Sequence, residues 1–226
     1  MLTKRTLLAT SALALIAGSG QANADGFYVS ILGGANFMQD KSGEQSVPFE
    51  GTSFRFDPDT GFTLGGAAGL HLDKWLKGLR VELEASYRHN DVGGSWTNFS
   101  VPFLFTGGPV NGTMSNFAVM ANVWYDIDVG QKWVPYLGGG AGWDRARFDG
   151  VFVGSTAFSV ERNGFAFQVG GGINYPIQDG VSLGIGYRYF RGPDIKNNIF
   201  VGKNNLPASL DNENHAVTLN LTIDTN

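Results

Sequence analysis

Acidic and basic residues alternate with apolar ones in segment 79–88, and this spacing places its charges on one face of an extended chain. Arg80, Glu82, Glu84 and Arg88 occupy even positions, whereas the odd positions are mostly apolar. In a β-strand, side chains of equal parity point to the same side. Charges gathered on one enclosed face either pair with one another as a polar filling or line a path for protons and small solutes.

Other segments also carry charged residues and glycines at even positions, on the polar face of the expected strand. The charged residues are Asp126, Asp144 and Arg188, and the glycines stand at 138, 140, 142, 170, 172, 184 and 186. Because glycine leaves space, the bulky charged side chains are expected to fill it and to pair with one another. The sequence therefore predicts a salt-bridged plug, or selectivity residues if the path is open, made by Arg80, Glu82, Glu84, Arg88, Asp126 and Arg188.

No catalytic residue is assigned from the sequence. His71, His89 and His215 lack the spacing of metal ligands. Acyl transfer needs a histidine, a serine and an orienting group, and His89 has only Asp91 and Ser95 nearby in the sequence.

Metal and cofactor sites are not expected either. The run Asp57-x-Asp59-x-Gly61 lacks the remaining ligands of a calcium loop and is interpreted as a turn. The glycine runs 138–140 and 170–172 are followed by no helix and are not phosphate loops. Cysteine is absent, which excludes disulfides, thiolate metal sites and a lipoprotein anchor.

Eight segments of the chain alternate apolar residues with small or polar ones, as half-buried strands do. They are 27–38, 62–72, 79–88, 116–126, 133–144, 165–177, 181–190 and 215–224. Connections after the second, fourth and sixth segments are short, and those after the first, third, fifth and seventh are long. Short periplasmic turns and long extracellular loops are typical of outer-membrane barrels, with both termini in the periplasm.

Aromatic residues recur ten residues apart on the apolar face of three segments, as Phe27/Phe37, Trp133/Trp143 and Phe165/Tyr175. Ten residues of a tilted strand climb ~25 Å, the height of the lipid-facing band of such a barrel. Aromatic rings favour both rims of that band. The predicted girdle consists of Phe27, Phe37, Tyr87, Phe117, Tyr125, Trp133, Trp143, Phe165, Tyr175 and Tyr187.

These patterns predict an all-β fold, an eight-stranded antiparallel up-and-down transmembrane β-barrel with short periplasmic turns and long extracellular loops. A soluble lipocalin-type barrel is the competing fold, but it would place its apolar face inside. Here the charged face also carries most of the glycines, which suits a packed polar lumen. An eight-stranded barrel is only just wide enough for its own side chains.

The N-terminus has the pattern of a secretory signal peptide: a basic start, an apolar run from Leu7 to Ala17, and Ala22-Asn23-Ala24 as the cleavage site. We expect residues 1–24 to be removed and residues 25–226 to form one barrel domain. Removing Lys4 and Arg5 changes the formal net charge from −4 to −6, which argues against nucleic acid as a partner.

Apolar residues in two of the long loops are candidates for contact with something outside the protein. They are Trp96, Phe99, Val101, Phe103, Phe105, Phe148, Phe152 and Phe158. Residues 148–160 are expected to form a hairpin that continues its two strands above the membrane. The apolar residues either contact a host surface, a neighbouring barrel or lipopolysaccharide, or pack loop against loop and cap the barrel.

Five ordered stretches resemble the alphaproteobacterial outer-membrane surface antigens and opacity-type barrels of Gram-negative bacteria. They are GFYVS at 26–30, RVELEASY at 80–87, NVWYDI at 122–127, VPYLGGGAG at 134–142 and GIGYRY at 184–189. The resemblance implies a barrel that displays variable, often antigenic and sometimes adhesive loops, and some relatives are described as porins. It also implies partners in outer-membrane lipid and the barrel assembly machinery, although the chain lacks the usual final aromatic residue, ending Ile223-Asp-Thr-Asn226.

The sequence thus leaves three functions open. The first is a non-enzymatic barrel that anchors extracellular loops for surface contact and envelope integrity. The second is a narrow or gated channel for small solutes. The third is an enzyme acting on outer-membrane lipid.

Overall fold

The computed structural model describes residues 26–39, 52–101, 104–152, 156–201 and 204–225, and these form an all-β structure. The strands are β1 (Phe27–Met38), β2 (Thr52–Pro58), β3 (Gly61–His71), β4 (Leu79–Val101), β5 (Leu104–Asp126), β6 (Val134–Phe152), β7 (Thr156–Gln178), β8 (Val181–Arg191), β9 (Ile195–Val201), β10 (Asn204–Leu210) and β11 (Glu213–Thr225). Among the described residues there is no helix with the length and apolar character needed to span a membrane.

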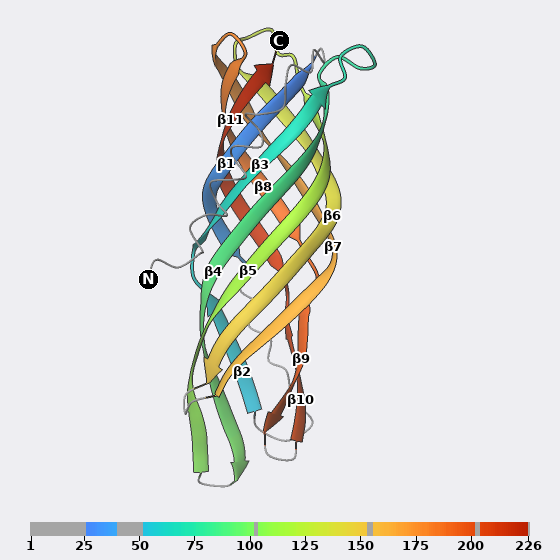
Figure 1. Ribbon diagram of the computed structural model, residues 1–226. Coiled ribbons are helices and arrows are strands. Elements are labelled where there is room, and N and C mark those ends of the chain that lie inside the picture. The colour runs from blue at the N-terminus through green and yellow to red at the C-terminus, as the bar shows by residue number, and fades with distance from the viewer. Residues whose placement is uncertain (1–25, 40–51, 102–103, 153–155, 202–203, 226) are drawn as a thin grey trace, which may run out of the picture.

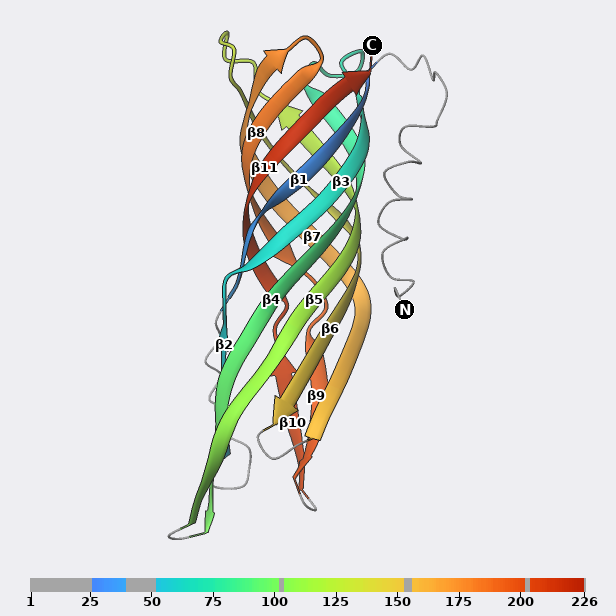
Figure 2. The same ribbon diagram turned by 60° about the vertical axis from the view of Figure 1, so that its left-hand side comes forward.

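The strands close into an antiparallel barrel. Each long strand pairs with its neighbours along the chain, and β1 pairs with β11 from Phe27↔Thr225 to Met38↔Asn214. Figures 1 and 2 show the tilted strands wrapping around a common axis, with the start of β1 and the end of β11 at the same end. The predicted antiparallel barrel is confirmed. We call the end that holds the start of β1 and the end of β11 the short-turn end, and the opposite end the long-hairpin end.

The structure has eleven strands where eight were predicted, because β2, β9 and β10 lie in segments that the sequence analysis left as long loops. β2 and β3 both pair with β4 and are separated by Asp59 and Thr60, where the Asp59 amide bonds to the Asp91 carbonyl at 2.8 Å. Likewise β9 and β10 follow β8 and precede β11 after short breaks, and they pair with each other as a separate two-stranded sheet. Bulges and breaks of this kind bend a strand without ending its path.

The hairpins at the long-hairpin end extend further than the sequence predicts. β4 and β5 remain paired from Leu79↔Tyr125 to Val101↔Leu104, so most of the predicted loop 89–115 is strand. The predicted continuation of the hairpin across 148–160 is confirmed, since β6 and β7 pair as far as Phe152↔Thr156. Beyond Tyr87, β4 runs on for roughly 45 Å at the usual rise per residue. Figure 2 shows β4 and β5 projecting well beyond the barrel wall.

The barrel is inverted relative to a soluble protein, with apolar side chains outside and polar ones inside. Leu83, Leu219 and Phe165 are more than 60% exposed, whereas Asn36, Glu84 and Asp144 are fully buried. Nine of the ten girdle residues lie exposed on the outer face, and Phe27 is half-buried. Such a surface requires an apolar surrounding, as lipid provides.

Short turns connect strands at the short-turn end, and each of the three holds a glycine in the left-handed region, at positions 78, 130 and 180. Gly78 has φ of 85°, and a Cβ there would overlap the carbonyl oxygen of Asp126. Gly130 has φ of 70° with no atom within 4 Å of such a Cβ. A side chain added at Gly130 meets only the conformational cost of the left-handed backbone, whereas one added at Gly78 also meets a steric cost.

We expect Gly130→Ala to lower the free energy of unfolding by about 1 kcal/mol, because only the left-handed backbone is penalised. Gly78→Ala should cost clearly more, because the backbone of Asp126 must also move. Denaturant unfolding of the two variants in the same micelles measures both. Equal losses would mean that the two turns tolerate a Cβ equally well.

Candidate functional site

The six residues expected to fill the barrel all point inward. Arg80, Glu82, Glu84, Arg88 and Arg188 are at most 8% exposed, and Asp126 is partly buried at the short-turn end. β4 supplies four of them because its even residues face the lumen. The candidate site is therefore the lumen itself, which can be followed from the short-turn end to the long-hairpin end.

Arg80 and Asp126 form the first layer. The guanidinium donates two hydrogen bonds to the carboxylate, at 2.7 and 2.8 Å, which is the strong bidentate geometry. Arg80 also lies 5.4 Å from the centre of the Tyr28 ring and 5.7 Å from that of Tyr136. Two aromatic rings and a carboxylate therefore hold this cation.

Glu82 is bound by neutral donors in the next layer. The Trp124 indole donates to Oε1 at 2.7 Å, the Tyr28 hydroxyl donates to Oε2 at 2.9 Å, and the Asn122 amide donates to Oε1 at 3.0 Å. A buried carboxylate needs this number of donors when a cation does not contact it directly.

Glu84 and Arg188 form an ion pair at the middle of the lumen. Glu84 also accepts hydrogen bonds from Asn122 at 2.9 Å and Gln168 at 3.2 Å, and Arg188 lies 5.1 Å from the centre of the Trp124 ring. Since both residues are buried, removing either one leaves a charge without its partner.

Arg88 is held differently from the other two arginines. Its guanidinium lies 3.8 Å from the centre of the Phe190 ring and donates to the Ser86 hydroxyl at 3.2 Å. Nearby, the Asp144 carboxylate accepts from Asn116 at 2.7 Å and Asn212 at 2.9 Å. Arg88 and Asp144 thus face the same region of the lumen, and each is held mainly by neutral groups.

Apolar side chains close the lumen at the long-hairpin end. The cluster contains Met38, Val92, Met114, Ala146, Phe148 and Ile195, with Val160 packed against it. Ile195, at the start of β9, is 4% exposed. We call this group the mouth cluster.

Phe148 is not an outward contact residue: its side chain is 4% exposed and packs inside the barrel, as the capping alternative predicts. The β4–β7 wall continues past the rim, so an inward residue at this height meets other inward residues instead of solvent. The remaining contact candidates lie outside the part of the structure whose side chains are described: Trp96, Phe99, Val101, Phe103, Phe105, Phe152 and Phe158.

Inward glycines make room for aromatic and amide side chains as well as for a charged one, where the sequence predicted space for charged residues alone; a Cβ at Gly170 would lie 3.2 Å from the Arg188 side chain. A Cβ at Gly69 would overlap the Tyr28 ring, and one at Gly138 would lie 2.7 Å from the Trp124 ring. At Gly186 a Cβ would lie 2.5 Å from the Tyr136 hydroxyl. Sequence reasoning missed Tyr28, Trp124 and Tyr136 as lumen residues, although their even positions in their strands carried the signal.

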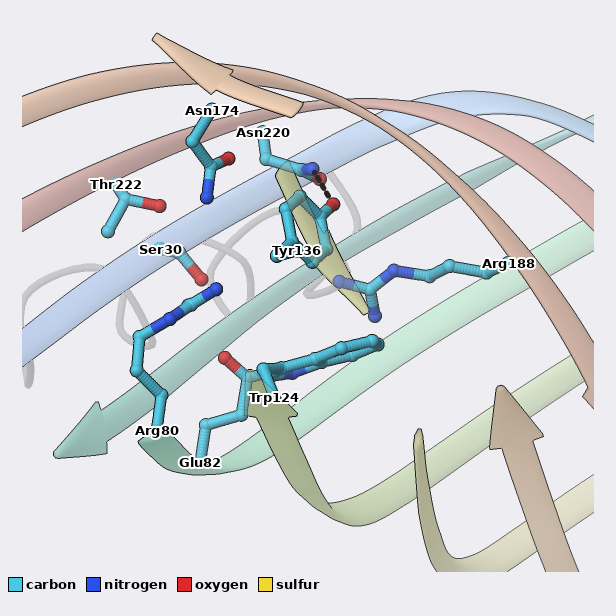
Figure 3. Close-up of a pocket in the computed structure, with 9 residues that line it drawn as sticks. All are labelled: Ser30, Arg80, Glu82, Trp124, Tyr136, Asn174, Arg188, Asn220 and Thr222. Atoms are coloured by element: carbon cyan, nitrogen blue, oxygen red, sulfur yellow. Dashed lines mark hydrogen bonds between the residues drawn. The ribbon is translucent and has the colours of Figure 1, made fainter. Parts of the chain in front are cut away.

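A small polar cavity remains on the short-turn side of this packing (Figure 3). It is lined by Ser30, Arg80, Glu82, Trp124, Tyr136, Asn174, Arg188, Asn220 and Thr222, and it has a volume of about 20 Å³ open to the centres of water-sized molecules. A single water needs roughly 10–15 Å³ by this measure. The cavity is thus a solvent-sized recess.

The histidines lie apart from this network or at its edge. His71 pairs with Asp224 at 2.9 Å at the short-turn end. On the outer face, His89 lies 3.7 Å from Asp91 and stacks near Tyr87, and His215 bonds to the Tyr187 hydroxyl at 2.5 Å. In the described ranges, no three His, Cys, Asp or Glu side chains gather as metal ligands.

Glu84→Ala should lower the free energy of unfolding by about 3–5 kcal/mol, because Arg188 then stays buried without its carboxylate. Glu161→Ala is the matched control, since Glu161 pairs with Arg145 at 2.6 Å on the exposed surface, and its removal should cost much less stability. The heat-modifiable shift on gels, followed against temperature, compares them. Similar losses would argue against the lumen pair as a stabilising contact.

Gly186→Ala should destabilise the barrel by pushing the new methyl group against the Tyr136 hydroxyl. Tyr136→Phe removes that oxygen and its hydrogen bond to Asn220, so it destabilises modestly on its own. The double variant should be more stable than the sum of the single effects predicts, which a double-mutant cycle of unfolding free energies measures. Strict additivity would contradict the close fit.

Comparison with known proteins gives the same fold. A family model described as "Outer membrane protein beta-barrel domain" matches residues 6–222. No curated protein sequence matches the chain.

Solved structures with this architecture include OprG of Pseudomonas aeruginosa, with 16% identity, 88% of this chain and 97% of that chain covered, and a TM-score of 0.57. Neisserial surface protein A has 19% identity, the same coverages and a TM-score of 0.51. A major outer membrane protein from Thermus thermophilus has 13% identity, coverages of 88% and 99%, and a TM-score of 0.50. At these identities the likeness concerns the fold.

Proposed function

We propose, from the premise that the chain belongs to the outer-membrane β-barrel domain family, that it is a closed, non-enzymatic barrel that anchors its hairpins at the cell surface. The hairpins would serve contact with other surfaces and envelope integrity. The barrel would be the rigid base and the hairpins the working part.

The observation that carries this proposal is the filled lumen. The Arg80–Asp126 and Glu84–Arg188 pairs, with their amide and aromatic partners, occupy the cross-section in successive layers. Above them the mouth cluster adds an apolar layer. The recess in Figure 3 has space for only about one water, which supports a lumen closed to solutes.

The unequal ends support the surface role. Turns at the short-turn end are brief and fastened to one another, whereas β4–β5 and β6–β7 extend as paired hairpins at the other end. Outer-membrane barrels keep short turns in the periplasm and long connections outside. We therefore place both termini in the periplasm and the hairpins outside, beside lipopolysaccharide and within reach of a neighbouring or host cell.

Planar-bilayer recordings of the refolded barrel test the proposal against the channel alternative. A closed lumen predicts no unitary conductance from a sample whose folding is confirmed by its heat-modifiable gel shift. Reproducible unitary steps would overturn the closed barrel and would make Arg80, Glu82, Glu84 and Arg88 selectivity residues.

Ile195→Asp should open the mouth, because a carboxylate cannot remain in the apolar cluster without a partner. The chain has no cysteine, so Ser86→Cys, at a lumen position 2% exposed, can report access to a water-soluble thiol reagent. Labelling should be slow in Ser86→Cys alone and faster when Ile195→Asp is added. Ile195→Val is the control and should leave it slow. Unchanged labelling in the variant that carries Ile195→Asp would show that Ile195 does not seal the lumen.

A further inference from the structure

The turn between β3 and β4 presents apolar side chains that nothing in the described structure covers. Trp75 is 86% exposed and Leu76 is 51% exposed, and Trp75 has the highest value among the large exposed apolar side chains of the described residues. Lys74 and Lys77 flank them. Exposed apolar groups of this size indicate contact with something outside the chain.

Hydrogen bonds build the turn firmly, so its shape is not that of a loose loop. The amides of Trp75 and Leu76 donate to the Leu72 carbonyl at 2.8 and 3.0 Å. The Gly78 amide donates to the Asp73 carboxylate at 2.7 Å, and the Asp126 amide donates to the Gly78 carbonyl at 2.7 Å. The backbone therefore holds the Trp75–Leu76 pair in a fixed place.

A second contact fastens this turn to the turn between β5 and β6. Lys77 donates to Asp128 at 2.8 Å, and this hydrogen bond holds the pKa of the Asp128 carboxyl below its usual range. This exposed ion pair joins the two neighbouring turns at the short-turn end. In Figure 1 the β3–β4 turn, in teal, leans outward from the barrel wall.

The Trp75–Leu76 pair continues the apolar outer face of the barrel. Tyr125 and Trp133, each 39% exposed, lie at the same end on β5 and just before β6. Tryptophan favours the boundary between hydrocarbon and headgroups, and lysine stems extend along apolar surface while the ammonium stays in water. A protein partner would not require this continuity with the lipid-facing band.

We infer that the β3–β4 turn is a lipid-binding anchor, with Trp75 and Leu76 inserted among the phospholipid headgroups of the leaflet at the short-turn end and the stems of Lys74 and Lys77 lying beside them. The inference rests on the proposed membrane placement of the barrel. The anchor fixes the depth at which the short-turn end sits.

The test uses the folded barrel in phosphatidylcholine vesicles, with and without lipids brominated high on their acyl chains. Subtracting the fluorescence of Trp75→Phe from that of the wild type isolates the Trp75 signal, and Trp75→Phe removes no contact within the protein that the structure shows. We expect bromolipid to remove most of that signal and aqueous iodide to remove little. Quenching by iodide but not bromolipid would overturn the anchor and favour a site for a soluble partner.

Trp143→Phe, made the same way, is the matched control. Trp143 lies on the outer face of β6 toward the long-hairpin end and is 57% exposed. If bromolipid quenches the Trp143 signal but not the Trp75 signal, the barrel is in the membrane and only the anchor is wrong. If neither signal is quenched, the membrane placement fails as well.

A spin label provides a second measurement that does not depend on tryptophan emission. Labels at Trp75→Cys and at Asp179→Cys, on the exposed β7–β8 turn of the same end, compare two turns. The label at 75 should collide more with oxygen, which dissolves in lipid, and less with a polar nickel complex than the label at 179. Equal collision ratios would count against the anchor.

Discussion

The narrow lumen is the constraint on which the rest of the structure depends. Closing a sheet satisfies every strand edge, but a barrel of this size leaves room inside for little beyond its own side chains. Each large inward side chain therefore needs a neighbouring position that carries no side chain. Tyr28, Trp124 and Tyr136 fit where Gly69, Gly138 and Gly186 leave no Cβ in the way. The glycine content of the chain follows from packing inside the barrel more than from turns.

A filled lumen also excludes most water, and this decides how charges are arranged. An isolated charge is costly there, so the carboxylates of Asp126 and Glu84 contact guanidinium groups, and Glu82 collects three neutral donors. Arg88 is covered by the Phe190 ring instead. The network links β1, β4, β5, β7 and β8 through side chains, which adds cross-barrel contacts to the backbone ladder. These cross-barrel contacts stiffen the wall.

How far the sequence predicts this structure depends on the surroundings of each segment. Within the lipid-facing band, one face is apolar and the other polar, so alternation located β1 at its observed bounds and β8 and β11 within two residues. Beyond the band both faces lose that contrast, and the long extensions of β4 and β5 were missed. The breaks at 59–60 and 192–194 depend on contacts such as Asp59 with Asp91, which pair residues distant in sequence.

The side chains inside the barrel show the same limit of what alternation along the chain can predict. Parity identified Arg80, Glu82, Glu84 and Arg88 as inward, because alternation is local information. It named Asp126 and Arg188 as charge partners but not which residue each one contacts, since pairing Glu84 with Arg188 requires the order of strands around the ring and the vertical register of β4 and β8. The sequence left contact and capping open for Phe148, because parity gives the side that a residue faces but not the height at which the opposite wall still covers it.

The two ends of the barrel differ in how far their strands extend and in how they are held together. A hairpin whose strand runs on for roughly 45 Å beyond Tyr87 transmits any force at its tip to the wall that holds it. The opposite end is tied by contacts between strands that are distant in sequence: His71 with Asp224 at 2.9 Å, and the Thr225 hydroxyl with the Phe27 carbonyl at 3.1 Å. These contacts lie where β1, β3 and β11 meet, so side chains reinforce the backbone pairing at the closing seam of the sheet. Side-chain contacts at the seam add to the backbone pairing that would hold the barrel closed if its hairpins were pulled, which is what the proposed surface anchor needs.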